Sequence, residues 1–548
     1  MDDRRAAGER QVGDDRTDGE LADSRLPGRA RARAATRVWL RRFTPRLAVA
    51  GAVSAFACTG PSAGPATPAA RTGPLTLTIG VPQSRQLDPS RGAPLIADFL
   101  AFERLTTNDA EGRTRPRLLE GWHTSADGLT WELRVRPDVR FQDGAPLVAA
   151  DVKRTFDAAM ANPALRGISV CLPNVVSVTA RSDRDVVVSL SRRCSYLLDD
   201  FDLAIRKTAP DGKSRIGTGA FAVASSSPDA IVLEANRNYH GGVPAIDRVV
   251  IKPFDALRTA WAGMMRGEVD FLWEVGPDTA EFLSDRSTVT VRSYLGYYAY
   301  AVMLNSARPA FRLPAVRRAL NLAIDRPTLV RQGLRDQGLP ADGPVWPRYW
   351  ARDTAASPAA FDPAGAEALL RGVGGKALEF TCLVPANYSI LERVALVVQR
   401  QFGDIGVRMR LESLPPDAFN RRISSGDFDA ALISVLGGPS ATVHHRLWHS
   451  PGATPRWNFW GYRNAGVDAA LDAALDAPAG EPGDASFRAA IARFEAAVRD
   501  DPPAVFLAWN QTVQAVSRRF ALPPGSDGRD AIYVVNQWQL RRPGADGR

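Results

Sequence analysis

The stretch 121–160 constrains the fold most, because its hydrophobic period changes from that of a strand to that of a helix. Residues 130–136 alternate strictly, with apolar and charged side chains on opposite sides, as a half-buried strand requires. The turn pairs Asp127-Gly128 and Asp143-Gly144 lie on either side of this strand. From 151 to 160 apolar residues recur at helical spacing. The pattern predicts a turn, a strand, a turn and a helix, and so an α/β fold.

This block resembles the signature of the peptide/nickel-type solute-binding proteins of ABC importers, in which a Trp, two Asp-Gly turns and an Asp-Val helix start follow in this order. Other segments match the same family in its own order over residues 75–540. The matching segments are 216–221, 236–253, 259–272, 316–330, 361–370, 396–411 and 487–510.

The resemblance implies the two-lobed periplasmic-binding-protein (Venus-flytrap) fold with an extra N-terminal subdomain, and a ligand cleft between the lobes. On this basis we expect lobe I to comprise residues 75–297 and 506–548, with the subdomain inserted at about 95–205. Residues 298–505 are expected to form lobe II.

The N-terminal region 1–57 is predicted to be a signal and targeting region. Its apolar run, 47–57, has the length of a signal-peptide core and is too short to span a membrane. The run ends in Ala-Phe-Ala before Cys58, which suits ordinary signal peptidase as well as lipoprotein cleavage. Because residues 58–74 are rich in Pro, Ala, Gly and Thr, as flexible tethers are, we favour lipidation of Cys58. A free secreted protein and an uncleaved anchor are the alternatives, and the predicted location is the periplasm or cell surface.

Charge and motifs exclude several classes of function. Residues 1–57 carry a net +4 of the chain's +9, and the remaining +5 does not predict a nucleic-acid partner. The sequence has no nucleophile elbow, zinc-protease motif, Walker loop or dinucleotide fingerprint. We therefore expect a monomeric binding protein without a cofactor, and not an enzyme.

The segment 428–440 is where the resemblance implies ligand contacts. In peptide-binding members this strand ends in a turn with a Trp that packs on the peptide and an Asp that holds its ammonium group. Here Asp429 is kept, but Val435 replaces the Trp and Gly438 replaces the Asp. The ammonium anchor is missing, so we expect contacts from Asp429 and from the backbone of a Gly-rich turn, including Leu436, Gly437 and Gly438.

Aromatic residues gather in three groups that either line the cleft or belong to the core. We expect ligand contacts from Tyr297, Tyr298, Tyr300, Trp346, Trp457 and Trp460, and from Asn305, which matches a family position near the hinge. Tyr294, Tyr349 and Trp350 belong to the same groups.

Two cysteines can face each other across a β-hairpin. Two β-rich runs flank the turn 181–184, and a symmetric hairpin about this turn places Cys171 opposite Cys194. An exported chain allows a disulfide, although Pro173 can disturb the register; the alternative is two buried free thiols. Cys382 is predicted to be a buried small hydrophobe.

Three of the five histidines, His444, His445 and His449, lie close together in the sequence. His445 and His449 could chelate a transition metal if the segment is helical. No acidic or Cys ligand flanks them in the sequence, so we favour packing or surface histidines and predict no metal site.

Together these features predict an extracytoplasmic solute-binding protein, lipid-anchored, that delivers a peptide-like or other small organic solute to the permease subunits of an ABC importer. The alternative is a ligand sensor or envelope interaction module on the same fold, which the missing Asp and Trp also suit.

Overall fold

The computed structural model describes residues 73–82, 92–212, 215–276, 288–355, 360–373, 378–386, 388–450, 458–478 and 481–541. Residues 71–548 form one compact unit. The predicted signal region, Cys58 and the tether up to residue 72 lie outside the described residues.

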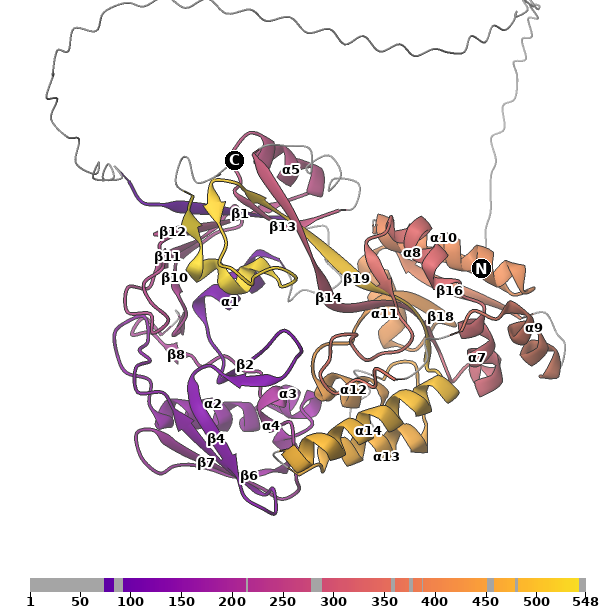
Figure 1. Cartoon of the computed structure of the whole chain (residues 1–548), viewed down its shortest axis with the longest axis horizontal. Helices are drawn as coiled ribbons and strands as arrows, with labels where there is room; N and C mark the ends of the chain where they lie inside the picture. The colour runs from indigo at the N-terminus through magenta and orange to yellow at the C-terminus, as the bar shows by residue number, and fades with distance from the viewer. Residues whose placement is uncertain are drawn as a thin grey trace, which may run out of the picture. The chain divides into compact units, whose positions relative to one another are not determined.

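An eleven-stranded mixed sheet is the backbone of this unit (Figure 1). β1 is parallel to β12 and β13, and β16 is parallel to β17 and β18, whereas the other pairs are antiparallel. Its strands, in spatial order, are β10 (Phe221–Ser226), β11 (Ile231–Ala235), β12 (Arg248–Phe254), β1 (Thr76–Pro82), β13 (Phe271–Val275), β19 (Ala504–Ser517), β14 (Val289–Leu304), β18 (Ala430–Leu436), β16 (Glu379–Pro385) and β17 (Arg408–Leu414), with β15 (Gly338–Pro340) paired to β19.

Two long antiparallel strands, β14 and β19, carry the sheet from one half of the unit to the other. Their pairing runs from Val289↔Ser517 to Met303↔Ala504, but it is interrupted between Leu295 and Ala299. The interruption leaves residues 296–298 of β14 without partners on β19, so their backbone groups can bond elsewhere.

Helices cover both faces of the sheet, because alternate residues of a strand point to opposite sides. In β13, Phe271 packs in one core cluster with α1 and the segment η3, whereas Leu272 packs in another with α5. The helices are α1 (Ala93–Ala101), α2 (Ala149–Ala161), α3 (Pro163–Ile168), α4 (Leu197–Asp200), α5 (Leu257–Met265), α7 (Pro314–Leu322), α8 (Arg326–Leu334), α9 (Pro363–Gly372), α10 (Ser389–Asp404), α11 (Pro416–Ser424), α12 (Ala441–Trp448), α13 (Ala465–Leu475) and α14 (Glu481–Asp500), with 3-10 turns η1 (Leu172–Asn174), η2 (Pro309–Phe311) and η3 (Ala531–Gln537).

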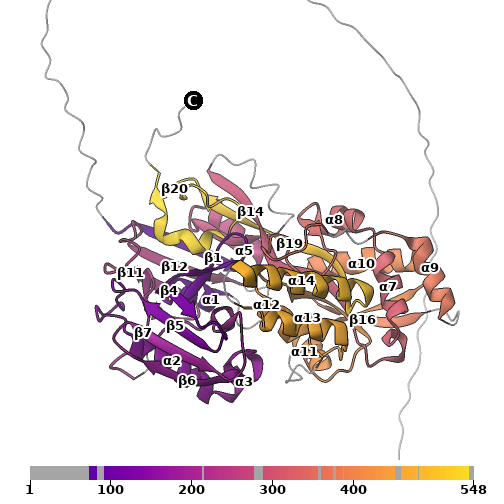
Figure 2. The same ribbon diagram turned by 60° about the horizontal axis from the view of Figure 1, so that its bottom comes forward.

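The same alternation buries β14 on both sides. Val302 packs in a cluster with α7, α8 and α10, whereas Met303 packs in a cluster that includes α12, α13 and α14. Figure 2 shows α13 and α14 side by side along this part of the sheet.

The predicted strand and helix of the stretch 121–160 are confirmed. The strand is β5 (Thr130–Val135), with its alternate residues buried, and the helix is α2, which begins at Ala149. Asp151 occupies the third helical position, where its carboxylate accepts a hydrogen bond from the N–H of Val148 at 2.9 Å and so caps the helix start. β5 joins a separate four-stranded sheet with β4 (Leu119–Thr124), β7 (Asp185–Leu190) and β6 (Val175–Ala180).

Short two-stranded ribbons complete the described secondary structure. They are β2 (Thr106–Asn108) with β3 (Thr114–Pro116), β8 (Lys207–Thr208) with β9 (Arg215–Ile216), and β20 (Phe520–Ala521) with β21 (Gln539–Leu540).

The β6–β7 hairpin differs by one residue from the symmetric register expected from the sequence. Ala180 pairs with Val186 instead of Asp185, and an irregularity after Val175 restores the expected offset at Val175↔Leu190. Cys171 and Cys194 lie beyond this irregularity, and the structure pairs them as a disulfide with Cα atoms 5.8 Å apart. Cys382 is buried without a disulfide partner.

Close packing explains the glycines of the Gly-Thr-Gly turn at 217–219. Neither Gly217 nor Gly219 has a positive φ. A Cβ atom at Gly217 would lie 2.2 Å from the carbonyl oxygen of Ala101, and one at Gly219 would lie 2.5 Å from the carbonyl oxygen of Leu100. Close packing against the end of α1 therefore excludes a side chain here.

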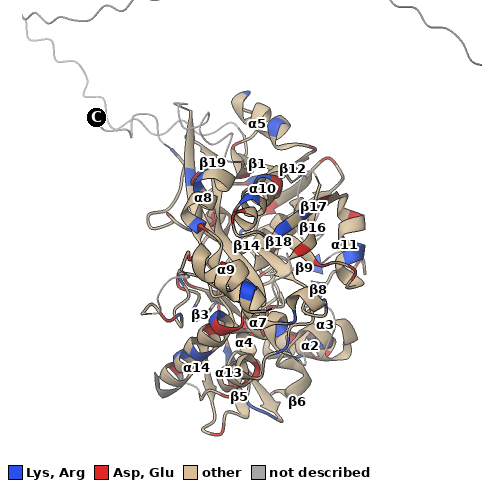
Figure 3. Cartoon of the chain, turned by 90° about the vertical axis from the view of Figure 1, so that its right-hand side faces the viewer, with Lys and Arg blue, Asp and Glu red and all other residues tan. Residues whose placement is uncertain are grey.

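Basic and acidic residues are interspersed along the helices seen in Figure 3. This distribution agrees with the mild charge of the chain beyond residue 57. Among the helices that the structure describes, none combines the length and apolarity that crossing a bilayer needs.

Candidate functional site

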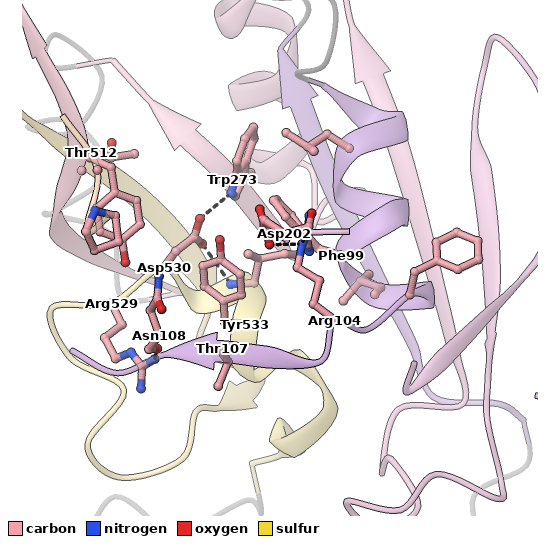
Figure 4. Close-up of a pocket in the computed structure, with 18 of the residues that line it drawn as sticks. Phe99, Arg104, Thr107, Asn108, Asp202, Trp273, Thr512, Arg529, Asp530 and Tyr533 are labelled. Atoms are coloured by element: carbon pink, nitrogen blue, oxygen red, sulfur yellow. Dashed lines mark hydrogen bonds and ion pairs between the residues drawn. The ribbon is translucent and has the colours of Figure 1, made fainter. Parts of the chain in front are cut away.

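A cavity of about 1230 Å³ is lined by residues that lie far apart in the sequence. Its wall comes from α1 and the segment after it, β2, α4, the middle of β14, the turn after β18, α12 and the segment 528–537. Drug-sized ligands occupy pockets of roughly 300–1,000 Å³, so this cavity can hold a small organic solute with water. Figure 4 shows the part of the wall built by Trp273, Asp530, Tyr533 and Arg104.

Asp530 is a buried carboxylate at which four hydrogen bonds converge. One oxygen accepts from Trp273 Nε1 at 2.9 Å and Tyr294 Oη at 3.1 Å. The other accepts from Gln514 Nε2 at 2.7 Å and the N–H of Ile532 at 3.0 Å. Burial raises the pKa of Asp530 above its ordinary value, although these donors oppose the shift. With its acceptor sites used, Asp530 fixes the positions of Trp273 and Tyr294 in the wall.

Glu103 and Arg104 place opposite charges beside each other on the wall. Burial opposes ionisation of Glu103, but the hydrogen bond from His240 and the charge of Arg117 together lower its pKa. Arg104 Nε lies 2.5 Å from a carboxylate oxygen of Asp202, as the dashed line in Figure 4 marks.

Asp199, at the end of α4, lies beside the turn that follows β18. Its carboxylate accepts hydrogen bonds from the hydroxyls of Thr114 and Ser440. Burial raises the pKa of Asp199 to about 7, with a smaller contribution from the nearby carboxylates of Asp202 and Asp200. Asp199 is therefore an acid whose charge state a bound cation can change.

Five of the residues predicted from the sequence line the cavity: Tyr297, Tyr298, Trp346, Leu436 and Gly438. The Tyr297 carbonyl, in the interrupted part of β14, accepts from the N–H groups of Gly437 and Gly438 at 2.8 and 3.1 Å. Trp346 donates a hydrogen bond through Nε1 to the carbonyl of Gly296 at 3.0 Å. Its ring packs edge-on against that of Tyr297, with the ring centroids 5.0 Å apart.

Three predicted polar residues do not reach the cavity, and hydrogen bonds elsewhere explain each. Tyr300 is buried and donates to Asn510 Oδ1 at 3.2 Å, so it stands behind the wall. Asn305 is buried and donates to the carbonyls of Gly426 and Phe428. Asp429 accepts from the N–H of Thr381 at 3.1 Å and lies near Arg308. These three residues therefore stand outside the cavity wall.

Three predicted apolar residues pack in the core instead. Val435 is buried in the sheet opposite Ala299. A Cβ atom at Gly437 would lie 2.1 Å from the Trp509 ring, so packing explains this glycine and close approach of a ligand does not. Trp460 is buried with its ring 5.4 Å from that of Trp448. Trp457, the other Trp of its group, lies outside the described residues.

The sequence interpretation missed Asp199, Trp273, Asp530 and Tyr533. They come from α4, β13 and the segment around η3, and the fold brings them to one cavity from positions up to 334 residues apart. Tyr294 alone among the hydrogen-bonding partners of Asp530 belongs to a group that the sequence singled out. No local motif marks the others.

The two α/β parts, the long strands that join them and a cavity lined from both define a two-lobed solute-binding protein. Comparison with known sequences places it within that class. Residues 113–452 match the family described as bacterial extracellular solute-binding proteins, family 5 Middle. The chain therefore belongs to the family 5 extracellular solute-binding proteins of ABC importers, a family of binding proteins.

Known relatives support this assignment. The glutathione-binding protein GsiB of Salmonella typhimurium is 26% identical over 384 residues, which cover 66% of this chain and 74% of GsiB. The structure of NikZ from Campylobacter jejuni in complex with Ni(L-His) has a TM-score of 0.71 at 24% identity and covers 84% of this chain and 99% of NikZ. That of CtaP from Listeria monocytogenes has a TM-score of 0.74 at 19% identity, covering 85% and 99%. The structural matches show the shared fold.

Proposed function

We propose that this protein captures a compact, amino-acid-derived zwitterion and delivers it to the permease of an ABC importer. The observation that carries the proposal is the mixed charge of the cavity wall, where five carboxylates and four guanidinium groups stand among aromatic rings. A solute that carries both an ammonium and a carboxylate group can pair with both kinds of wall residue. Glutathione, after which GsiB is named, and histidine, which accompanies nickel in the NikZ complex, are both molecules of this kind.

Asp199 is proposed as the group that holds the ammonium. The family's Asp in the turn after β18 is replaced by Gly438, but Asp199 reaches the same turn from α4 and bonds with Ser440. A carboxylate near this turn is therefore supplied by a different element of the fold. Arg446 lines the same region and pairs with Asp200 at 2.6 Å, so it adds a guanidinium group to the mixed charge of this part of the wall.

We further propose that one lobe comprises residues 75–297 and 506–548 and that the other comprises residues 298–505. The paired strands β14 and β19 would pass from one lobe to the other and join them. The wall residues fall on both sides of these boundaries, among them Asp530 and Val443. A solute that touches both lobes stabilises the closed form by its differential affinity for that form. The permease would recognise this closed form.

The protein is proposed to be a monomeric lipoprotein, exported by the signal region 1–57 and anchored through Cys58, with residues 58–74 as its tether. The Ala-Phe-Ala-Cys sequence and the composition of the tether support this assignment.

Native mass spectrometry of the chain purified gently from the cell envelope, compared with a denatured sample, tests the solute class. We expect a stoichiometric adduct that is lost on denaturation and has the mass of an amino-acid derivative. A protein that carries no adduct, and whose melting temperature does not change with glutathione, histidine or nickel-histidine, would contradict the proposal and favour an interaction module.

Calorimetric titration of Asp199→Asn with the identified solute tests the anchor. Loss of a buried charge partner costs about 2–5 kcal/mol of binding free energy. Asp157→Asn is the control, because Asp157 pairs with Lys153 on the outer surface of α2 and lines no part of the cavity. Equal affinity of the Asp199 variant and the wild type would remove Asp199 from the proposed site.

A further inference from the structure

Two helices outside the cavity bring three metal-ligating side chains together. His445 lies on α12 and His449 directly follows it, so the two imidazoles stand one helical turn apart. Asp472 faces them from α13. One ligand atom from each of the three residues lies within 4.8 Å of the others. The acidic partner that the sequence does not place beside the histidines is thus supplied by the fold.

Both imidazoles present a buried nitrogen that lacks a hydrogen bond. Nε2 of His445 and Nε2 of His449 have no hydrogen-bond partner in the part of the chain that the structure describes. The nearest carboxylate oxygens, both of Asp472, lie at 3.8 and 3.6 Å, beyond hydrogen-bond range. An unpaired buried polar atom destabilises a fold, so two of them near one carboxylate indicate a missing partner.

The spacing of the three groups suits a metal ion as that partner. Nitrogen and oxygen ligands that lie about 2.0–2.2 Å from a tetrahedral metal are roughly 3.3–3.5 Å from each other. The observed 3.6 and 3.8 Å separations come within small side-chain rotations of that geometry. Asp468, one turn before Asp472, has an oxygen 3.8 Å from Nδ1 of His449, which adds a second carboxylate near the cluster.

The surrounding charges allow Asp472 to give up its ion pair with Arg192. Arg192 Nη2 lies 3.3 Å from Asp472 and 2.9 Å from Asp476. When Asp472 turns to a cation, Arg192 keeps its pair with Asp476. Arg446, the other nearby cation on α12, already pairs with Asp200.

These residues are separate from the solute cavity. The cavity wall includes Val443 and Arg446 of α12 but none of the three clustered residues. The cluster lies between α12 and α13. It is beside Arg192, which follows β7 of the four-stranded sheet. An ion bound here would therefore link α12 to α13 and would not be carried as part of the solute.

We propose that His445, His449 and Asp472 form a binding site for a divalent d-block cation such as Zn²⁺. Two imidazoles and one carboxylate are ligands that zinc, cobalt and nickel accept, and water completes the coordination. The ion joins the end of α12 to the middle of α13.

The test uses the full chain, stripped with a chelator and titrated with Zn²⁺ by calorimetry and with Co²⁺ by visible absorption. We expect one equivalent of metal, a visible Co²⁺ spectrum with imidazole ligation and a higher melting temperature. His445→Ala, His449→Ala and Asp472→Asn should each weaken binding more than the roughly 10–100-fold that loss of an outer-shell partner costs.

His123→Ala serves as the control, because it removes an exposed histidine on β4, away from α12 and α13. This variant is expected to keep the affinity of the wild type.

Three results would overturn the proposal. They are an absence of Zn²⁺ binding by the wild type at millimolar concentration, binding that the three ligand substitutions leave unchanged, and X-ray absorption of the zinc-loaded wild type without imidazole scattering. The last measurement needs no variant, so it holds even if a substitution unfolds the chain.

Discussion

At the scale of single residues, Asp199 is the group on which the proposed solute recognition depends most. Its carboxylate lies at the cavity wall and accepts hydrogen bonds from two hydroxyl groups. Burial raises its pKa to about 7. Acids with strongly raised pKa values inside cavities are frequent at functional sites. The pH of the medium should therefore change both solute binding and stability through this residue.

We expect solute affinity to rise with pH up to about 7 and then to level off, because an ammonium group binds the ionised form of Asp199. Below that pH, binding should release a proton, which calorimetry in buffers of different ionisation enthalpy measures. Without solute, the folded chain holds this proton where the unfolded chain has lost it, so the contribution of Asp199 to stability falls as pH rises from about 4 to 7. In Asp199→Asn both effects should vanish, and their persistence would assign them to another group.

Gly437 gives a residue-scale prediction about packing. Its missing side chain leaves room for the Trp509 ring, which a Cβ would approach to 2.1 Å. Gly437→Ala should destabilise the fold by about 1–3 kcal/mol, as overpacking of a core does. Gly403→Ala is the matched control: this glycine lies inside α10 with open space around it, so the change should stabilise by roughly 0.5–1 kcal/mol. Chemical denaturation measures both, and an unaffected Gly437 variant would show that Trp509 can move.

At the scale of elements, the sequence predicts best those segments whose pattern is local. β5 and α2 follow from a change of hydrophobic period within one stretch of the chain. The predicted hairpin register is wrong by one residue, because the irregularity after Val175 leaves no sign in the order of apolar residues. The cavity wall is predicted only in part, since Asp199 and Asp530 reach it through long-range topology that no single segment encodes.

The Cys171–Cys194 pair belongs to this scale because it ties together the open end of the β6–β7 hairpin. The cysteines are 23 residues apart, and a disulfide across a loop of this size stabilises by about 3 kcal/mol. The double variant Cys171→Ala, Cys194→Ala should unfold at correspondingly lower denaturant concentration than the oxidised wild type. Reducing agent should lower the stability of the wild type and leave that of the double variant unchanged. Two free thiols in the exported protein, found by mass mapping without reduction, would contradict the pairing.

At the scale of the whole molecule, β19 pairs with β13 of one half and β14 pairs with β18 of the other, and the pairing of β14 with β19 joins the two halves. The solute cavity is lined from both halves. Strands that cross between lobes can act as a hinge if their pairing is weak at one point. The interruption of the β14–β19 pairing at residues 296–298 is such a point, and Tyr297 and Tyr298 of this segment line the cavity.

We expect the bound solute to shift the protein towards a more compact form. Small-angle X-ray scattering should show a lower radius of gyration when the identified solute saturates the wild type. Asp199→Asn at the same solute concentration serves as the control and should remain close to the apo value. An unchanged radius in the saturated wild type would contradict closure about β14 and β19.

The position of β19 also has a consequence for how the chain reaches its folded state. β13 and β14, which precede it by about two hundred residues or more, both pair with it, and Asp530 follows it. Most of the polypeptide must therefore be synthesised before the central strand of the sheet exists. We expect this late closure to leave β13 and β14 without their shared partner until the chain is nearly complete, which would suit threading through a translocation channel. A chain stopped before residue 504 should accordingly be digested rapidly by protease, and resistance equal to that of the full chain would argue against this order of events.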